Sequence, residues 1–480
     1  MSVIQYICMS DVHFGADNSV LTNLTTGLTL GVDPSEPSTS LIKLVDCLRA
    51  LVKEQIPNVR PRLILNGDIF EFALAEDNLA GMAFQRFLEL AMPNKPEERL
   101  FDDEILYIPG NHDHHLWEGA REIQYADFIR RHPTSHLPAP WHATKMDRIG
   151  PVASPYVNAV IDACGVVGVR VNVRYPNLIL RDEAARRSIV FSHGHFTEPL
   201  YTLMTTLSHL LFPPTKPDVT EPAWAWESEN FAWIDFFWGT MGRSGFVGQD
   251  IGLIYEMMQD PRVFGAFIGK AAERLAQQRT IWPLAKLLGW LVRRSTTQRM
   301  ERGAPDQMLG DGGAGVRKYL SEGVYKQLEQ ELKDALSDDI VFVFGHTHKP
   351  FQMEMEVDFP NPRKMRLYNS GGWVVDRTKP GPLYGGAVVL ISENLDVVSL
   401  RMYNEHEQKE QYGVSVQAVG RDCGTPFFQQ LESKINSQCK LPPWRDFSDS
   451  VAAAVIEHNA KLRNDINESR LRRRARGLKL

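Results

Sequence analysis

Five short clusters of residue types that bind metal ions lie in order along the chain, between Asp11 and His348. Their sequences are Asp11-Val12-His13, Asn66-Gly67-Asp68-Ile69-Phe70-Glu71, Gly110-Asn111-His112-Asp113, Ser192-His193-Gly194-His195 and Phe344-Gly345-His346-Thr347-His348. A single cluster would mean little, but five supply carboxylate, amide and imidazole ligands that suit a pair of divalent metal ions. Two ions about 3.5–4 Å apart can hold a phosphate group and lower the pKa of a shared water molecule. This is the chemistry of phosphate ester hydrolysis.

Such a reaction places two further demands on the residues. One short carboxylate must reach both ions, and Asp68 is the natural bridge because it lies between the early and the late clusters. The alkoxide that leaves phosphorus also needs a proton, which a histidine beside the metals but not bound to them can donate.

Each cluster directly follows a short apolar run, which is typical of a strand buried on both faces. The runs are Val3 to Met9, Arg62 to Leu65, Ile105 to Ile108, Ser188 to Phe191 and Ile340 to Phe344. Helical spacing separates several of them, as in the apolar residues from Leu41 to Leu51 that follow a start signal at Ser38. The pattern predicts an α/β protein. Because ligands of open α/β sheets collect at the carboxyl ends of strands, the five clusters should meet at one rim.

Composition excludes several classes of protein. The net charge of −6 and the pI of about 6.2 give no overall basic field for nucleic acid. The five cysteines are scattered and odd in number, which argues against a disulfide framework and favours a reducing compartment. Met1 to Ser10 lacks the features of a signal peptide, and no apolar run approaches the roughly 20 residues of a spanning helix. We therefore expect a cytoplasmic protein, with peripheral membrane contact as an alternative.

In this order the clusters resemble the motifs of the calcineurin-like metallophosphoesterases: DxH, GDxx(D/E), GNH(D/E), a histidine before glycine, and GHxH. The segment Leu367 to Gly372 is similar to the family's Asn-x-Gly strand, and Gly386 to Tyr403 is similar to its closing hairpin. The resemblance covers a discontinuous core of residues 1–195 and 339–403. It implies two central sheets flanked by helices and leaves 196–338 and 404–480 unexplained.

The resemblance also implies a set of site residues. The metal ligands would be Asp11, His13 and His348 on the first ion, Asn111, His193 and His346 on the second, and Asp68 between them. His112 would be the general acid or a phosphate contact, and Glu71 falls at the position that orients this histidine. Mn²⁺ is the expected metal, with Fe, Zn, Ni and Mg as alternatives that such ligands also accept.

Residues 196–338 form an insertion that holds six of the ten tryptophans, so we expect a mainly helical unit. Aromatics at this density usually build a helical core, and the alternative is a lid with an apolar groove. Because the insertion lies between two ligand motifs, both of its ends are expected near the site. The stretch Ile281 to Met300 mixes apolar residues with arginines and could contact a bilayer or hold acyl chains. The candidate substrate contacts are His195, His114, Arg293 and Arg294. His195 would contact phosphate, and the alternative is that it replaces His193 as a metal ligand.

Three interpretations of function remain at this point. The first is a hydrolase of a phosphate ester or pyrophosphate on a lipid-linked or nucleotide-type substrate. Gly67 to Phe72 followed by an insertion is similar to the UDP-2,3-diacylglucosamine pyrophosphohydrolase branch of the family, although this insertion is longer. The second is a nuclease that uses the helical extension 404–480, whose end is rich in arginine. The third is a noncatalytic scaffold on the same fold.

Overall fold

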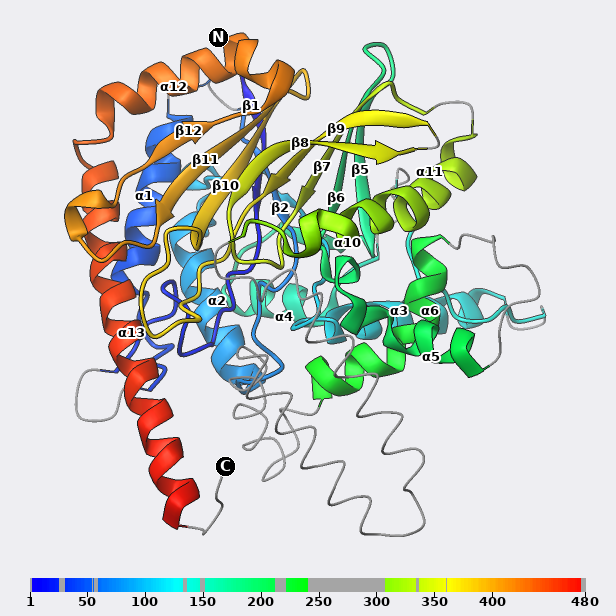
Figure 1. The fold of residues 1–480 in the computed structure, drawn as a ribbon, viewed down its shortest axis with the longest axis horizontal. Helices are drawn as coiled ribbons and strands as arrows, with labels where there is room; N and C mark the ends of the chain where they lie inside the picture. The colour runs from blue at the N-terminus through cyan, green and yellow to red at the C-terminus, as the bar shows by residue number, and fades with distance from the viewer. Residues whose placement is uncertain are drawn as a thin grey trace.

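The structure is a computed structural model of the chain. It describes residues 2–475 except for 26–30, 54, 56–58, 133–135, 147–151, 212–221, 241–306, 334–335 and 360. Within these residues the expected α/β class is confirmed, because a seven-stranded and a five-stranded sheet pack together with helices around them (Figure 1).

The first sheet has the strand order β12-β11-β10-β1-β2-β3-β4. Four neighbouring strands are parallel: β1 (Ile4–Met9), β2 (Arg62–Leu65), β3 (Glu104–Tyr107) and β4 (Arg170–Val173). Three antiparallel strands extend the sheet beyond β1: β10 (Gly385–Ser392), β11 (Val397–Asn404) and β12 (Ser415–Gln417). The hairpin expected over Gly386 to Tyr403 is the β10–β11 pair.

The second sheet has the strand order β5-β6-β7-β9-β8. Its strands are β5 (Asn177–Asp182), β6 (Arg187–Ser192), β7 (Asp339–Phe344), β8 (Phe351–Asp358) and β9 (Pro362–Asn369). Strands β6, β7 and β9 are parallel, and β5 and β8 are antiparallel to their neighbours. The insertion 196–338 is therefore the crossover between β6 and β7, two adjacent parallel strands.

This topology corrects one expectation about the insertion. It begins just beyond the carboxyl end of β6, beside His195, but it ends where β7 begins, at Asp339. Asp339 pairs with Arg187, the first residue of β6, so it lies at the amino ends of these strands, opposite the metal-ligand motifs. A connection between two parallel strands runs from the carboxyl end of the first strand to the amino end of the second. Only one end of the insertion can therefore lie near the metal-ligand motifs.

The two sheets pack face to face through a buried apolar layer. Cys8, Ile64 and Leu106 from the first sheet belong to the same cluster as Ile189 and Val343 from the second. Because both faces of each central strand are covered, these strands read in the sequence as continuous apolar runs. This packing brings the carboxyl ends of β1, β2, β3, β6 and β7 to one region.

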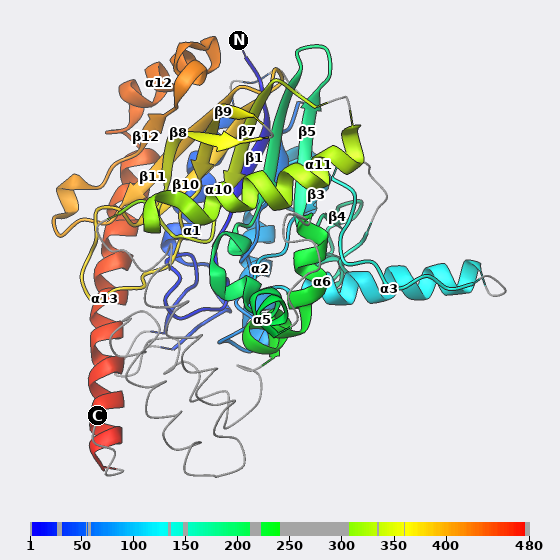
Figure 2. The same cartoon turned by 45° about the vertical axis from the view of Figure 1, so that its right-hand side comes forward.

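Helices cover the outer face of the first sheet (Figures 1 and 2). They are α1 (Thr39–Val52), α2 (Asp77–Ala91), α4 (Pro155–Ala163), α12 (Pro426–Gln438) and α13 (Trp444–Ala475). Helix α1 begins as predicted, since the Ser38 hydroxyl accepts a hydrogen bond from the Leu41 amide at 3.1 Å. Trp444 and Phe447 of α13 and Phe427 of α12 are buried in the same core as β1, so the residues after 404 complete this layer.

The described part of the insertion is helical and covers the second sheet. It comprises α5 (Leu203–Leu211), α6 (Ala223–Ile234), the π-helical turn η4 (Asp235–Thr240), α10 (Ala314–Lys318), the π-helical turn η6 (Tyr319–Val324) and α11 (Tyr325–Leu332). Trp226, Tyr319 and Leu328 pack in one cluster with Phe342 of β7. The segment Ile281 to Met300 lies outside the described residues.

The remaining elements are α3 and a few short turns. Helix α3 (His115–Arg131) projects from the body beside α6 (Figure 2). The 3₁₀ turns are η1 (Pro96–Glu98), η2 (His195–Thr197), η3 (Pro199–Thr202), η5 (Gly310–Gly313), η8 (Lys409–Gln411) and η9 (Gly420–Gly424). Among the described residues, no helix combines the length and the apolar character needed to cross a bilayer.

Candidate metal centre

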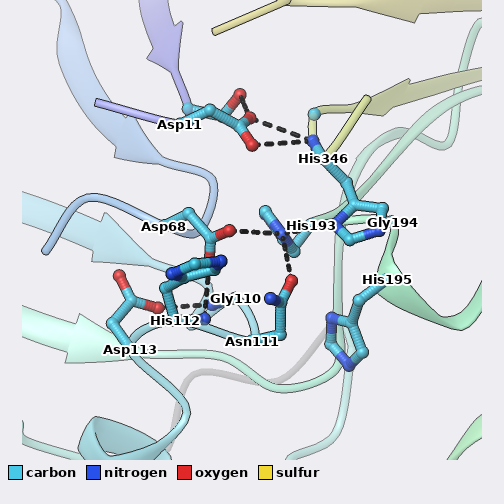
Figure 3. A network of polar contacts seen from close by, with 12 residues as sticks. Asp11, Asp68, Gly110, Asn111, His112, Asp113, His193, Gly194, His195 and His346 are labelled. Atoms are coloured by element: carbon cyan, nitrogen blue, oxygen red, sulfur yellow. Dashed lines mark hydrogen bonds and ion pairs between the residues drawn. The ribbon is translucent and has the colours of Figure 1, made fainter. Parts of the chain in front are cut away.

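The predicted ligands and the predicted general acid lie in five loops, each at the carboxyl end of a strand. Three loops follow β1, β2 and β3 of the first sheet, and two follow β6 and β7 of the second. Figure 3 shows side chains from these loops gathered in one region. At most 2% of the surface is exposed in each of the eight residues Asp11, His13, Asp68, Asn111, His112, His193, His346 and His348.

The first group of ligand atoms belongs to Asp11, His13 and His348. One donor atom from each lies within 4.8 Å of the others, a spacing suited to a single ion. His348 Nε2 is 3.4 Å from Asp11 Oδ1. These are the three residues that the resemblance assigns to the first metal.

The second group belongs to Asp68, His193 and His346, and their donor atoms satisfy the same 4.8 Å limit. His193 Nε2 lies 3.2 Å from Asp68 Oδ2, 3.1 Å from Asn111 Oδ1 and 3.3 Å from His346 Nδ1. A ring nitrogen carries at most one proton, so it cannot hydrogen-bond to all three at once. Four donor atoms that converge in this way fit a cation better than a hydrogen-bond network.

The two groups are neighbours, and one buried nitrogen faces the gap between them. His13 Nε2 has no hydrogen-bond partner among the described residues, and it lies 3.7 Å from Asp68 Oδ2. A buried imidazole nitrogen without a partner costs about 1–3 kcal/mol, so the arrangement fits an ion in contact with both side chains. Asp68 accordingly stands where a bridging carboxylate would have to stand.

Neighbouring groups orient the rings of three ligand histidines toward the site. The Nδ1 atoms are held by Glu71 for His13 at 2.8 Å, by the Asn66 carbonyl for His193 at 3.2 Å, and by Asp376 for His348. A carboxylate or carbonyl on one ring nitrogen fixes the ring and leaves the other nitrogen for a metal, which is the usual arrangement in metalloproteins.

The backbone of the ligand loops is strained. In the described residues, eight non-glycine residues have a positive φ, and five of them are Asp11, His13, Asp68, His346 and His348, with φ between 50° and 68°. Each costs of order 1 kcal/mol or more, and such strain persists at sites where the surrounding structure requires it. Gly110 of the third motif is equally constrained, because a Cβ there would collide with the Asp68 carboxylate.

Charges inside the site are strongly coupled. Burial opposes ionisation of Asp68, but the positive charge of His193 and His112 outweighs burial and lowers the pKa of Asp68 well below its usual value. Burial would likewise lower the pKa of His193, yet the Asp68 carboxylate raises it to about 9. Protons on the histidines thus compensate the carboxylates in the absence of another cation, and a metal ion would replace them.

His112 is held by the same glutamate that holds His13. Glu71 Oε1 lies 2.9 Å from His112 Nδ1, and the His112 amide donates to Asp68 Oδ1 at 2.8 Å. Burial opposes the charge of Glu71, but His112 and His13 lower its pKa to about 2, so it remains a carboxylate. The ring of Trp238, from the insertion, lies 5.1 Å from the His112 ring. His112 is thereby placed beside the ligands without belonging to either ligand group of three.

The chain matches no protein-family model, and no curated protein is similar enough to count as a relative. The motifs and the geometry of the site therefore carry the functional assignment on their own.

Of the four predicted substrate contacts, two are buried in the structure and two lie outside the described residues. His195 is buried beside the second ligand group, with its ring centroid 5.6 Å from that of His193. His114 is fully buried, and its Nε2 lies 2.8 Å from Glu227 of α6. Arg293 and Arg294 lie outside the described residues.

Three carboxylates support the site although sequence reasoning gave them no role. Asp376 holds His348, and Glu198 Oε1 lies 3.4 Å from His346 Nε2. Asp113 ties two ligand loops together by accepting hydrogen bonds from the amides of Ile69 at 2.8 Å and Gly110 at 2.6 Å. Asp113 follows the GNH motif and could have been found there, whereas Asp376 and Glu198 belong to no motif.

Proposed function

We propose that this protein is a phosphoesterase that uses two divalent metal ions, on a fold of the calcineurin-like metallophosphoesterase type. The observation that carries the proposal is the pairing of two ligand groups across the His13–Asp68 gap of 3.7 Å. Asp11 and His346, 335 positions apart, are joined directly, since the His346 amide donates to Asp11 at 2.9 Å. A scaffold would not need strained, buried ligand side chains or the unpartnered nitrogen of His13.

The donor set fits the cofactor. Carboxylate, amide and imidazole ligands suit Mn²⁺, and they also accept Fe, Zn or Ni. Asp11, His13 and His348 would hold one ion, Asn111, His193 and His346 the other, and Asp68 both. When bound, such a pair neutralises charge on phosphoryl oxygens and makes a hydroxide nucleophile available near neutral pH.

The remaining chemistry belongs to side chains of this chain. His112 lies beside the ligand groups, so it donates a proton to the alkoxide that leaves phosphorus. Glu71 keeps the His112 ring in place through the 2.9 Å contact with Nδ1, which directs Nε2 to the substrate side. Trp238 shields this ring from one side and brings the insertion to the edge of the site.

The decisive experiment is a hydrolysis screen of the Mn²⁺-loaded protein. The substrates are aryl phosphate mono- and diesters, nucleotides, a lipid pyrophosphate and single-stranded DNA. We expect hydrolysis of at least one phosphate ester, with two metal ions per chain by elemental analysis. Cleavage of DNA with a steep salt dependence would instead indicate a nuclease, and absence of both metal and hydrolysis would leave only a scaffold.

The His112→Ala variant tests the assignment of the proton donor. It should retain both metal ions and lose roughly 10²–10⁴-fold in rate on substrates with a poor leaving group. The loss should be smaller on an aryl ester, whose leaving group needs less protonation. His142→Ala, which changes a half-buried histidine that contacts Arg121 of α3, is the matched control. Full activity of His112→Ala on an alkyl phosphate would remove His112 from the mechanism.

A further inference from the structure

A second buried polar network adjoins the metal centre and takes no part in the chemistry above. It consists of Glu227 on α6, His114 before α3, Tyr175 between β4 and β5, and His195 beyond β6. Each of these residues is at most 2% exposed. Glu227 comes from the insertion and the other three come from the core, so the network joins the two parts.

Three contacts link the four side chains. Glu227 Oε1 lies 2.8 Å from His114 Nε2, and Glu227 Oε2 accepts the Tyr175 hydroxyl at 2.8 Å. The Tyr175 oxygen in turn lies 3.2 Å from His195 Nε2. Burial and the Glu227 carboxylate raise the pKa of Tyr175 well above its usual value, so the hydroxyl keeps its proton.

The positions of the protons follow from these contacts. A carboxylate only accepts hydrogen bonds, so Tyr175 must give its single O–H to Glu227. The Tyr175 oxygen can then only accept from His195, which places the proton of His195 on Nε2 and leaves a lone pair on Nδ1. His114 likewise presents Nε2 to the Glu227 carboxylate, which leaves its Nδ1 outside the network. Both Nδ1 atoms are buried, and neither has a hydrogen-bond partner among the described residues.

The His195 ring lies beside the second ligand group, since its centroid is 5.6 Å from that of His193. Figure 3 shows the His195 ring below His193. The lone pair on His195 Nδ1 needs a donor, which a hydroxyl or a water supplies, whereas a phosphate oxygen only accepts.

We propose that Glu227 is a positioning residue which, through Tyr175, holds His195 as a hydrogen-bond acceptor for an O–H group beside the second ligand group. The O–H group belongs either to a hydroxyl of the substrate next to its phosphate or to a water molecule in the site. The role of His195 in the reaction rests on the proposed function. The proton positions of Tyr175 and His195 follow from their contacts alone. The insertion thereby contributes to the site a residue that touches neither substrate nor metal.

The proton positions can be measured on the metal-free protein, without any activity. The full-length chain is labelled with ¹⁵N-histidine, and the His195 signal is assigned by its loss in His195→Gln. We expect His195 to be neutral with its proton on Nε2. In Tyr175→Phe and Glu227→Gln this preference should be lost or reversed. Glu229→Gln, two residues along the same helix, is the matched control and should leave the His195 signal unchanged.

Kinetics on two probes then separate the sources of the O–H group. Glycerol 2-phosphate carries hydroxyls beside its phosphate, and 4-nitrophenyl phosphate carries none. A roughly tenfold loss of kcat/KM in Tyr175→Phe, the worth of one hydrogen bond, confined to the first probe supports a substrate hydroxyl. The same loss on both probes supports a water.

The proposal is overturned if native His195 carries its proton on Nδ1, if both variants keep the native proton position, or if neither probe is affected. These failures are distinct from failure of the proposed function, in which the native protein hydrolyses no phosphate ester of the screen while the His195 signal behaves as expected.

Discussion

The two ends of strand β7 both bury charge, and they compensate it in opposite ways. At the amino end, Asp339 belongs to a network in which aspartates alternate with arginines. Arg366 Nη2 lies 2.5 Å from Asp339 Oδ1, and Arg421 Nη1 lies 2.7 Å from Asp339 Oδ2. The full network contains Asp339, Asp396 and Asp422 with Arg187, Arg366 and Arg421.

At the carboxyl end of β7 the buried carboxylates have no such partners. Among the described residues, no lysine or arginine forms an ion pair with Asp11, Asp68 or Glu71, and only histidines face them. The arginine network is therefore complete within the chain, while at the other end of the strand only protons on the histidines, or a cation in their place, balance the carboxylates. At a site with metal-ligand geometry, buried carboxylates without lysine or arginine partners point to a bound cation.

The largest expected effect is that of Asp68→Ala. Because Asp68 faces both ligand groups, its loss should release both metal ions and lower the hydrolysis rate by about 10³-fold or more, the size of effect seen when a key electrostatic group is removed. In the metal-free protein His193 and His112 hold the pKa of Asp68 well below its usual value, so the carboxylate stabilises the fold and its removal should lower the free energy of unfolding. Elemental analysis, kinetics and denaturant unfolding measure the three quantities.

The control for Asp68→Ala is Asp162→Ala, which removes an exposed carboxylate paired only with Arg170 and should change none of them. If Asp68→Ala keeps both metal ions and hydrolyses its substrate at the native rate, Asp68 serves only the fold and the contrast between the two ends of β7 disappears.

A different pattern is expected for Asp422→Ala in the arginine network. Burial raises the pKa of Asp422, and the Arg366 guanidinium opposes that shift. Without Asp422 the buried Arg366 cannot lose its charge and keeps only Asp339 as a partner, so unfolding should cost about 3 kcal/mol less. Metal content and the rate per folded molecule should not change. A loss of metal with unaltered stability would show that the network serves the site.

An intermediate effect is expected for Asp376→Ala. Asp376 contacts His348 Nδ1 and thereby orients Nε2 toward Asp11, so its removal should weaken metal binding by roughly 10–100-fold without abolishing it. Competition with a fluorescent chelator measures the affinity. Asp376→Asn should retain part of the effect because its amide oxygen can still accept from His348. Unchanged affinity in both variants would limit the site to the residues that face the ions.

Sequence reasoning reached the ligands but not the residues that hold them. Each ligand cluster directly follows an apolar run in the sequence. This order predicted strand β1 with Asp11 at its end, and strand β7 with His346 at its end. Asp376 and Glu227 lie in loops or helices with no motif, and they meet their histidines only through folding. Glu227 contacts His114 across 113 positions, a pairing that no local spacing encodes.

The position of the insertion shows a different kind of error. Both of its ends were expected at the site because ligand motifs precede and follow it. The inference overlooked strand direction, since β7 must first traverse the sheet from Asp339 before it delivers His346. A parallel pairing of β6 with β7, once known, places the two ends correctly.

The smallest expected effect concerns a third way to bury a carboxyl group, as the neutral acid. Glu405 is 1% exposed, and its Oε2 accepts the Gly381 amide at 2.9 Å. Burial raises the pKa of Glu405 to about 8, with a further contribution from Asp376, although Arg377 opposes it. The folded state then binds more protons than the unfolded chain between about pH 4.5 and 8. Stability is therefore lost as the pH rises through this window, by about 1.4 kcal/mol per pH unit at most. Glu405→Gln, which stays neutral, should flatten the pH dependence of the unfolding free energy measured in the presence of a chelator.

Identical slopes for the native chain and Glu405→Gln would mean that Glu405 is ionised in the fold. A buried carboxylate without arginine or metal would then be tolerated next to the site, and the absence of arginine around Asp68 would lose its force as a sign of a bound cation.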